Sequence, residues 1–499
     1  TADMSTMLAQ LEAEVGQLVD NAVAVINSTP GDGATVAGTW RLVTFGLGLH
    51  DSDSSTSGIQ AGTFAMDAGI GTLIITDDGN GDLSIANGAF EDFYTNFTTG
   101  PGGTSIYYET DIGVGDDETF GATIDSDGNI QVSFPFEEEL QSVDLITDPD
   151  GPDFGWRWPP STHITTDTGN GNVNVLLFRE AGIRYATTDT DNDGVNDAVD
   201  PNARSGDEVS LGLDMLLKQG SDMSDASLSG DYGVVSMKVG VHTTPSATDL
   251  NADVGVMTFD GSGGLSALAN ALNYVEINRS TSSGVVLIVD NADDPNPLTA
   301  SYSVSTTGAL SLDFGGGNIS DGVSSDDGTF FVTISAATTD NGGAPATIVN
   351  VDQQIIVGMK LEAATPDLSD AVYRLFPLIA SFQDDGVTGL FSVSASSRLT
   401  FNSTADSATF SGTDTGFERS HDTAEVAAVV DDEGGDSLFA VTTAGSSAIT
   451  MTLNDGEDDV NIQGFVSADG KLMVLRVHGE DALDPTLWQD LGIMLAVRQ

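Results

Sequence analysis

The chain has 499 residues, of which 39% are hydrophobic and 7% aromatic, enough apolar material for packed cores in roughly two to four domains. Its formal net charge is −61 with only 15 lysines and arginines, which excludes nucleic acids and anionic membranes as partners and favours divalent cations. The absence of cysteine excludes disulfides, thiolate metal sites and cysteine nucleophiles.

The chain begins with Thr1, and no basic segment followed by an apolar stretch comes after it. We therefore expect a bacterial protein that is secreted or displayed on the cell surface, with its signal peptide already removed. No apolar run approaches the ~20 residues of a membrane-spanning helix, so we expect no membrane insertion.

Residues 1–30 are expected to form an N-terminal helix, because apolar side chains recur within residues 3–27 at alternating steps of four and three. This is the spacing of a coiled-coil seam over about three heptads. Such a helix packs either on its own domain or on another subunit, and the second arrangement makes the chain a homo-oligomer or polymer. The predicted seam consists of Met4, Leu8, Leu11, Val15, Leu18, Ala22 and Val25.

Three segments of similar sequence indicate that one unit occurs three times. Residues 38–50, 230–242 and 371–383 align without a gap, and the third residue of each is aromatic: Trp40, Tyr232 and Tyr373. An Asp-Gly turn follows at a similar distance, at Gly128, Gly328 and Gly470. An apolar run that ends in a basic residue then closes each copy, at 173–179, 355–360 and 493–498. The three units are expected at residues 34–183, 226–363 and 367–499.

Each unit has the pattern of β structure. Segments such as residues 71–76 and 329–334 are rich in β-branched and aromatic side chains, and Asp-Gly, Asn-Gly and Gly-Gly turns separate such segments at short intervals. A meander of this size closes best as an up-and-down barrel of about eight strands, because closure removes exposed strand edges. The sequence therefore predicts an all-β protein with three tandem antiparallel β-barrel-like domains, with β-sandwiches as the alternative.

The opening Gly38-Thr39-Trp40 of the first unit is similar to the first-strand motif of lipocalins, which implies a barrel. The second and third units depart from this motif because they carry tyrosine at the aromatic position.

Residues 134–160 are an insertion in the first unit, long enough to project as a functional loop. The insertion contains an acidic run at 137–139 and the aromatic pair Trp156 and Trp158. Two tryptophans can stack on a sugar or on a neighbouring subunit, and they can equally attach the loop to its own domain.

Residues 186–224 are expected to link the first and second units and contain the acidic stretch TDTDNDGVNDAVDP. Counted from Asp189, oxygen donors stand at positions 1, 3, 5, 9 and 12, with Gly194 at the sharp turn of position 6. The spacing resembles EF-hand loops and the calcium repeats of thrombospondin type 3, which implies Ca²⁺ as a cofactor. The alternative is a solvated acidic linker. The candidate ligands are Asp189, Asp191, Asp193, Val195 through its carbonyl, Asp197 and Asp200.

Residues 207–219 (DEVSLGLDMLLKQ) are expected to form a short linking helix after this loop. Calcium in the loop would then fix the angle between the first unit and the rest of the chain.

No catalytic constellation is recognisable in the sequence, and we expect no enzymatic activity. The histidines show none of the common metal or nucleophile motifs, and carboxylates are too abundant for any pair to be informative. We therefore expect an extracellular structural protein that assembles into a calcium-stabilised filament, layer or sheath. The alternative is a binding module or adhesin that holds a glycan or an apolar ligand in a barrel or at Trp156 and Trp158.

Overall fold

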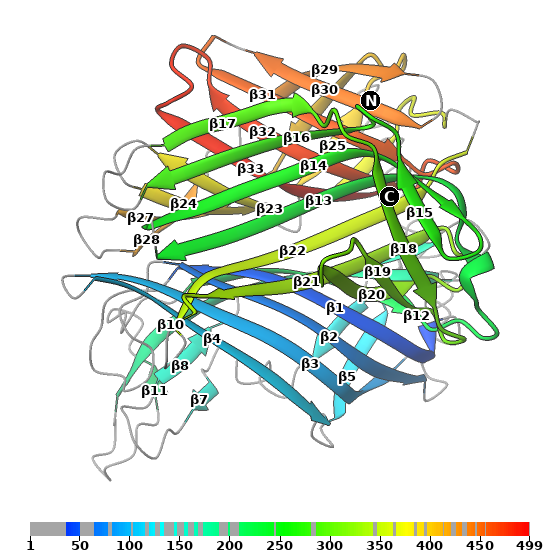
Figure 1. Cartoon of the computed structure of the whole chain (residues 1–499), viewed down its shortest axis with the longest axis horizontal. Helices are drawn as coiled ribbons and strands as arrows, with labels where there is room; N and C mark the ends of the chain where they lie inside the picture. Colours follow the sequence, from blue (N-terminus) through cyan, green and yellow to red (C-terminus); the bar gives the residue numbers. More distant parts are fainter. Residues whose placement is uncertain are drawn as a thin grey trace, which may run out of the picture.

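The computed structural model describes most of the strands of all three units (Figure 1). The described residues are 36–49, 64–77, 82–100, 103–114, 119–124, 130–133, 144–146, 154–157, 164–167, 173–188, 198–199, 209–243, 246–280, 286–342, 347–362, 366–383, 387–393, 397–412, 414–420, 426–431, 437–444, 447–454 and 456–498. The predicted N-terminal helix lies outside them. No helix among the described residues is long and apolar enough to span a bilayer.

The second unit is a closed antiparallel barrel of eight strands, as expected. In the ring, β13, β14, β15, β18, β19, β20, β21 and β22 follow one another in chain order, and β22 pairs back to β13. The hairpin β16–β17 leaves the ring and pairs with the first half of β14 as a side sheet. The strands are β13 (Ser229–Thr243), β14 (Ser246–Asp260), β15 (Gly264–Ala267), β16 (Leu272–Ser280), β17 (Val286–Asp293), β18 (Leu298–Val304), β19 (Ala309–Asp313), β20 (Ile319–Ser324), β21 (Phe330–Asp340) and β22 (Ile348–Lys360).

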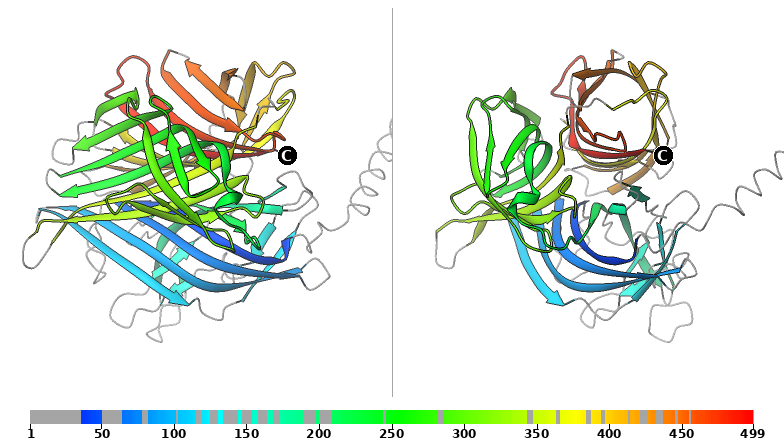
Figure 2. Two further views of the ribbon diagram at one scale, coloured as in Figure 1. Left: turned by 45° about the vertical axis from the view of Figure 1, so that its right-hand side comes forward. Right: turned by 90° about the vertical axis from the view of Figure 1, so that its right-hand side faces the viewer.

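The third unit is also a closed eight-stranded barrel, seen end-on in the right-hand view of Figure 2. Its side sheet consists of β24, β27 and β28 and pairs with the second half of β23. The strands are β23 (Val372–Gln383), β24 (Val387–Val393), β25 (Arg398–Phe401), β26 (Ser407–Ser411), β27 (Asp414–Ser420), β28 (Val426–Asp431), β29 (Ser437–Ala444), β30 (Ala448–Asn454), β31 (Asp458–Val466), β32 (Leu472–Asp481) and β33 (Trp488–Arg498).

The first unit differs from the expected barrel. Its described strands form a curved sheet in the order β6-β5-β3-β2-β1-β12-β10-β8-β7, and within these strands no pairing joins β6 to β7. The strands are β1 (Gly38–Leu49), β2 (Phe64–Asp77), β3 (Asp82–Gly100), β4 (Gly103–Val114), β5 (Thr119–Ile124), β6 (Ile130–Ser133), β7 (Asp144–Ile146), β8 (Phe154–Arg157), β9 (Ile164–Asp167), β10 (Val173–Thr188), β11 (Ala198–Val199) and β12 (Val209–Lys218).

The prediction of a linking helix at 207–219 is wrong, because β12 occupies this segment and pairs with both β1 and β10. Its side chains are buried at every second position, which is the period of a strand. Leu216 is buried as well, so the apolar run lacks a clean alternation and imitates a helix. The acidic loop at 189–200 therefore precedes the last strand of the first unit, and the expected boundary at residue 183 falls inside that unit.

β12 also replaces the run 173–179 as the closing strand of the first unit. Lys218 lies opposite Trp40 in the β1–β12 ladder. In the same way, Lys360 lies opposite Tyr232, and Arg498 lies opposite Tyr373. The three closing strands thus place a basic residue beside the aromatic residue of the first strand.

A buried hydrogen bond joins the aromatic residue to the Asp-Gly turn in two of the units. The Tyr232 hydroxyl donates to the Gly328 carbonyl over 2.5 Å, and the Tyr373 hydroxyl donates to the Gly470 carbonyl. Both tyrosines are fully buried. The sequence spacing between aromatic residue and glycine therefore corresponds to a direct contact that closes each barrel.

The three sheets pack around one shared apolar core, so the units form a cluster and not an extended row (Figure 2). The long strands contribute to the shared core because one face of each strand packs inside its own barrel and the other face packs against a neighbouring unit. In β13, Tyr232 and Val234 point into the barrel, while Val235, Met237 and Val239 point outward into the shared core. Separate apolar clusters fill the two barrels.

A short 3₁₀ turn, η1 (Asp225–Ser227), connects the first unit to the second. Polar contacts then fix the units against one another. The Gln353 amide of β22 donates to the Thr95 hydroxyl of the first sheet over 2.9 Å. Arg476 of β32 donates to the Asn273 side-chain oxygen of the second unit over 2.8 Å. Gln353 and Arg476 are both buried, so these contacts lie inside the interfaces.

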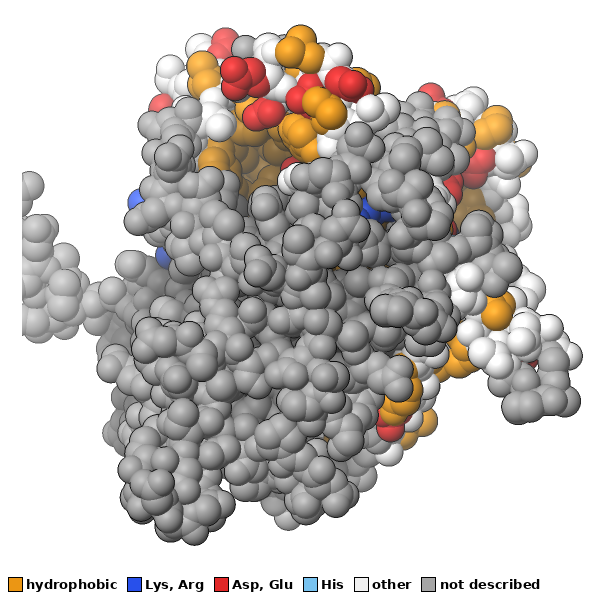
Figure 3. Space-filling model, turned by 90° about the vertical axis from the view of Figure 1, so that its left-hand side faces the viewer, with side chains coloured by type: hydrophobic (Ala, Val, Ile, Leu, Met, Phe, Trp, Pro, Cys, Tyr) orange, Lys and Arg blue, Asp and Glu red, His pale blue; other side chains and the backbone are white. Residues whose placement is uncertain are grey.

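The face shown in Figure 3 carries Asp and Glu side chains beside hydrophobic ones on its upper part, where the second and third units lie. Acidic side chains on an exposed face agree with the large negative net charge of the chain.

Candidate functional site

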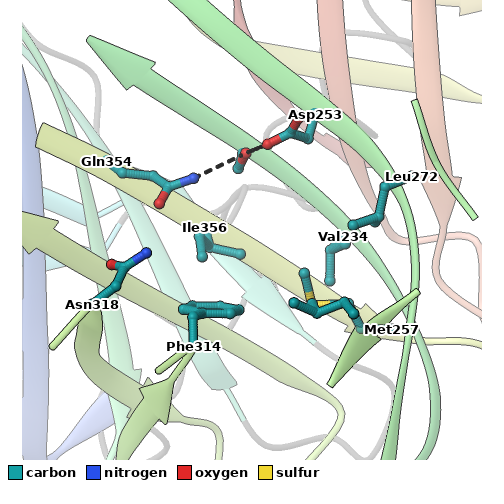
Figure 4. A pocket seen from close by; sticks show the side chains of 10 residues that line it. Val234, Asp253, Met257, Leu272, Phe314, Asn318, Gln354 and Ile356 are labelled. Atoms are coloured by element: carbon teal, nitrogen blue, oxygen red, sulfur yellow. Dashed lines mark hydrogen bonds between the residues drawn. The ribbon is translucent and has the colours of Figure 1, made fainter. Parts of the chain in front are cut away.

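A half-open cavity of about 240 Å³ lies between the wall of the second barrel and β16 of its side sheet. Strands β13, β14, β16, β18 and β22 and the turn between β19 and β20 line it, and Figure 4 shows their side chains facing a common space. Most of the wall is apolar. The lining residues are Val234, Ser236, Asp253, Met257, Leu272, Leu298, Phe314, Asn318, Gln354 and Ile356.

An aromatic cluster closes the barrel beside this cavity. Tyr232 packs edge to face on Phe259, with ring centroids 4.9 Å apart. Phe259 in turn contacts Tyr302 and Phe331. Val234, two residues further along β13 than Tyr232, lines the cavity. The third barrel is filled by large apolar side chains such as Phe401 and Met451, as small barrels commonly are.

Three side chains form a polar corner in the cavity wall: Ser236, Asp253 and Gln354. The Ser236 hydroxyl donates to Asp253 Oδ2 over 2.7 Å. The Gln354 amide donates to the Ser236 oxygen over a longer 3.5 Å (Figure 4). A chain of hydrogen bonds therefore runs along the wall and ends on a carboxylate.

Burial raises the pKa of the Asp253 carboxyl above its ordinary value, because the charged form loses contact with water. The Ser236 hydrogen bond and the positive charges of Arg476 and Lys238 act in the opposite direction. Burial in turn lowers the pKa of Arg476 to about 10. The carboxylate is therefore only partly compensated by its surroundings.

A turn of three glycines borders the cavity at Gly315, Gly316 and Gly317. Their φ angles are 84°, 67° and 89°. Three successive residues in this left-handed region favour glycine, because residues with a Cβ rarely adopt positive φ. Phe314 and Asn318, which flank the turn, line the cavity, and the Phe314 N–H donates to the Asn318 carbonyl over 3.0 Å. The turn thus positions one apolar and one amide side chain at the cavity.

Sequence reasoning missed this site, because its residues come from positions 234 to 356 and form no local motif. Ser236 and Asp253 lie opposite each other only because β13 and β14 pair in this register. The Gly-Gly-Gly run is the single local signal near the cavity.

The six predicted calcium ligands, Asp189, Asp191, Asp193, Val195, Asp197 and Asp200, lie outside the described residues. The segments beside them are described, and they pair: Thr187 lies opposite Val199, and Thr188 lies opposite Ala198. The two ends of segment 189–197 are therefore held together. Within the described part of the chain, no group of three or more His, Asp or Glu side chains is arranged to hold a metal ion.

Part of the tryptophan insertion is built into the first sheet. Trp156 lies in β8, opposite Arg184 of β10 and Asp144 of β7. Trp158 lies outside the described residues, as do the helix positions Met4, Leu8, Leu11, Val15, Leu18, Ala22 and Val25.

Two histidines are described, and both have carboxylate or amide partners. His242, near the end of β13, pairs with Asp249, whose hydrogen bond raises the pKa of the imidazole. His478 of β32 shares a hydrogen bond of 2.8 Å with Gln489, and burial lowers its pKa. Neither residue lines the cavity.

No known family model matches the sequence, and no curated protein matches it. The chain is similar to a solved transferrin binding protein B double mutant from Haemophilus parasuis, with 8% identity, a TM-score of 0.24, and coverage of 93% of this chain and 76% of that chain. It is also similar to OprB from Pseudomonas putida, with 7% identity, a TM-score of 0.15, and coverage of 93% of both chains. TM-scores this low do not indicate a shared function.

Proposed function

We propose that this protein is an extracellular or cell-surface binding module of a bacterium, and that its second barrel holds a small ligand with an apolar body. The observation that carries the proposal is the cavity of about 240 Å³, whose mostly apolar walls carry the polar corner and the Asn318 amide. Binding sites for small molecules typically combine an apolar lining with a few placed polar groups.

The size of the cavity limits the ligand. A closed apolar cavity of about 150 Å³ is known to bind benzene. By volume alone, the half-open cavity of about 240 Å³ has room for one ring with a short substituent. The polar corner would orient the substituent, and the walls from Val234, Met257 and Ile356 would cover the ring.

Ligand-observed NMR with monocyclic aromatic fragments tests this proposal. Leu298→Trp places a larger ring in the cavity wall and is expected to weaken fragment binding at least about ten-fold, a loss of roughly 1.4 kcal/mol. Leu268→Trp is the matched control, because Leu268 is 80% exposed in the same unit. Equal binding by both variants would show that fragments bind elsewhere.

A second candidate function is a subunit of a calcium-stabilised filament, layer or sheath. The specific observation in its favour is the short β10–β11 ladder, which holds the ends of the acidic segment 189–197 together. A closed loop with alternate carboxylates suits a hard cation that prefers six to eight oxygens. Calcium would then stabilise the link between β10 and β12 inside the first unit, and the N-terminal seam would join subunits.

This candidate is tested by light scattering and thermal unfolding with calcium, with magnesium and with EGTA. Calcium is expected to raise the unfolding temperature and promote assembly, and Asp193→Asn should abolish both effects. Glu362→Gln, an exposed change outside the loop, is the control. Identical unfolding and assembly in calcium and EGTA would refute the calcium role.

A further inference from the structure

We propose that the ligand of the second barrel is an organic amine, whose ammonium group binds Asp253 while its apolar body fills the cavity. This inference rests on the proposed binding function and specifies the chemical class of the ligand.

The geometry of Asp253 is the first argument. Among the described residues, the Ser236 hydroxyl is the one hydrogen-bond donor to this carboxylate, and it reaches only Oδ2. No described lysine, arginine or histidine lies within ion-pair distance of Asp253. The second carboxylate oxygen therefore remains available to a donor in the cavity that Asp253 lines.

The charge balance around the carboxylate is the second argument. Lys238 and Arg476 act on Asp253 only at a distance, and Asp294 acts against them. Arg476 is occupied by the side-chain oxygens of Asn273 and Gln463, at 2.8 Å each. A partly buried carboxylate with no cation in direct contact lowers the stability of the fold. An ammonium group placed against the carboxylate supplies the missing positive charge.

The composition of the walls and of the chain is the third argument. Asp253 would repel an anionic ligand at short range, and the net charge of −61 would repel it at long range. Both repulsions oppose the binding of an anion. A neutral alcohol would donate a hydrogen bond but supply no charge. The apolar walls from Met257, Leu272 and Phe314 in turn exclude a small, fully hydrated cation such as ammonium itself.

Benzylamine and benzyl alcohol are suitable probes, because they have nearly the same shape and differ in charge. We expect the amine to bind the full-length protein at least about ten-fold more tightly than the alcohol at neutral pH, since charged hydrogen bonds in a low-dielectric site are the stronger ones. In Asp253→Asn this preference should disappear, because both probes then meet a neutral amide. Asp321→Asn, which removes an exposed carboxylate of the same unit, should keep the preference.

A pH titration of the wild-type protein gives a second readout that does not depend on the stability of the variant. Amine binding should weaken as the pH falls and Asp253 becomes protonated, whereas alcohol binding should not change. Equal or tighter binding of the alcohol would overturn the amine inference but leave a binding function in place. Absence of binding by both probes at millimolar concentration would refute both proposals.

Discussion

Tyr373→Phe tests whether the contact between the first-strand aromatic residue and the Asp-Gly turn holds the barrel closed. Tyr373 is fully buried, and its hydroxyl donates to the Gly470 carbonyl 97 residues away. Phenylalanine fills the same space but leaves that carbonyl without this donor. A buried polar group that loses its partner costs about 1–3 kcal/mol, so the free energy of unfolding should fall by that amount at pH 7.

Alkaline pH supplies a second, independent measurement of the same contact. Burial raises the pKa of Tyr373 above its ordinary value of 10.0, so above pH 10 the unfolded chain releases this proton and the folded chain keeps it. Stability is therefore complete below pH 10 and falls as the pH rises. From pH 10 to 11 a single such group accounts for about 1 kcal/mol, and Tyr373→Phe should lose that much less than the wild type.

Urea unfolding monitored by tryptophan fluorescence at pH 7, 10 and 11 measures both quantities. Tyr232→Phe is the matched variant, because Tyr232 makes the equivalent bond to Gly328 in the second barrel. A Tyr373→Phe protein with wild-type stability at pH 7, or with the wild-type decline above pH 10, would refute this reasoning.

Three further predictions concern one interface between units and the two described histidines. Gly233→Val should lower the free energy of unfolding in urea by about 1–3 kcal/mol. The reason is that a Cβ at residue 233 would lie 2.3 Å from the Phe465 ring of the neighbouring unit. Phe465→Leu should partly restore stability in the double variant. His478 has a pKa lowered by burial, so the unfolded chain binds its proton first and stability should fall below pH 6.5; His478→Gln should reduce this acid loss. The Asp249 hydrogen bond raises the pKa of His242. The stability that this pair contributes is therefore complete below pH 6.5 and is lost as the pH rises through the raised pKa. Asp249→Asn should remove this loss, which urea unfolding at several pH values measures.

The sequence predicts the strand content and the barrel type because both depend on local patterns. Turn residues at short intervals and β-branched segments correspond to the strands of the second and third units. The spacing from Tyr232 to Gly328 and from Tyr373 to Gly470 is readable because each pair touches in the folded barrel.

Other features depend on contacts between distant segments. In β12, Leu216 and Leu217 are both buried because the strand has covered faces on two sides, and this removes the alternation that distinguishes a strand from a helix. The strand order of the first sheet, the shared core and the cavity around Asp253 follow from the pairing of strands far apart in the chain. No local spacing encodes them.

The shared core has a consequence for anyone who divides this chain into fragments. A barrel expressed alone would carry the outward side chains of its long strands, such as Val235 and Met237 of β13 or Ile493 and Leu495 of β33, on a bare surface. Contiguous exposed apolar surface of this kind promotes aggregation. Single excised units are therefore expected to aggregate through surfaces that the intact polypeptide covers.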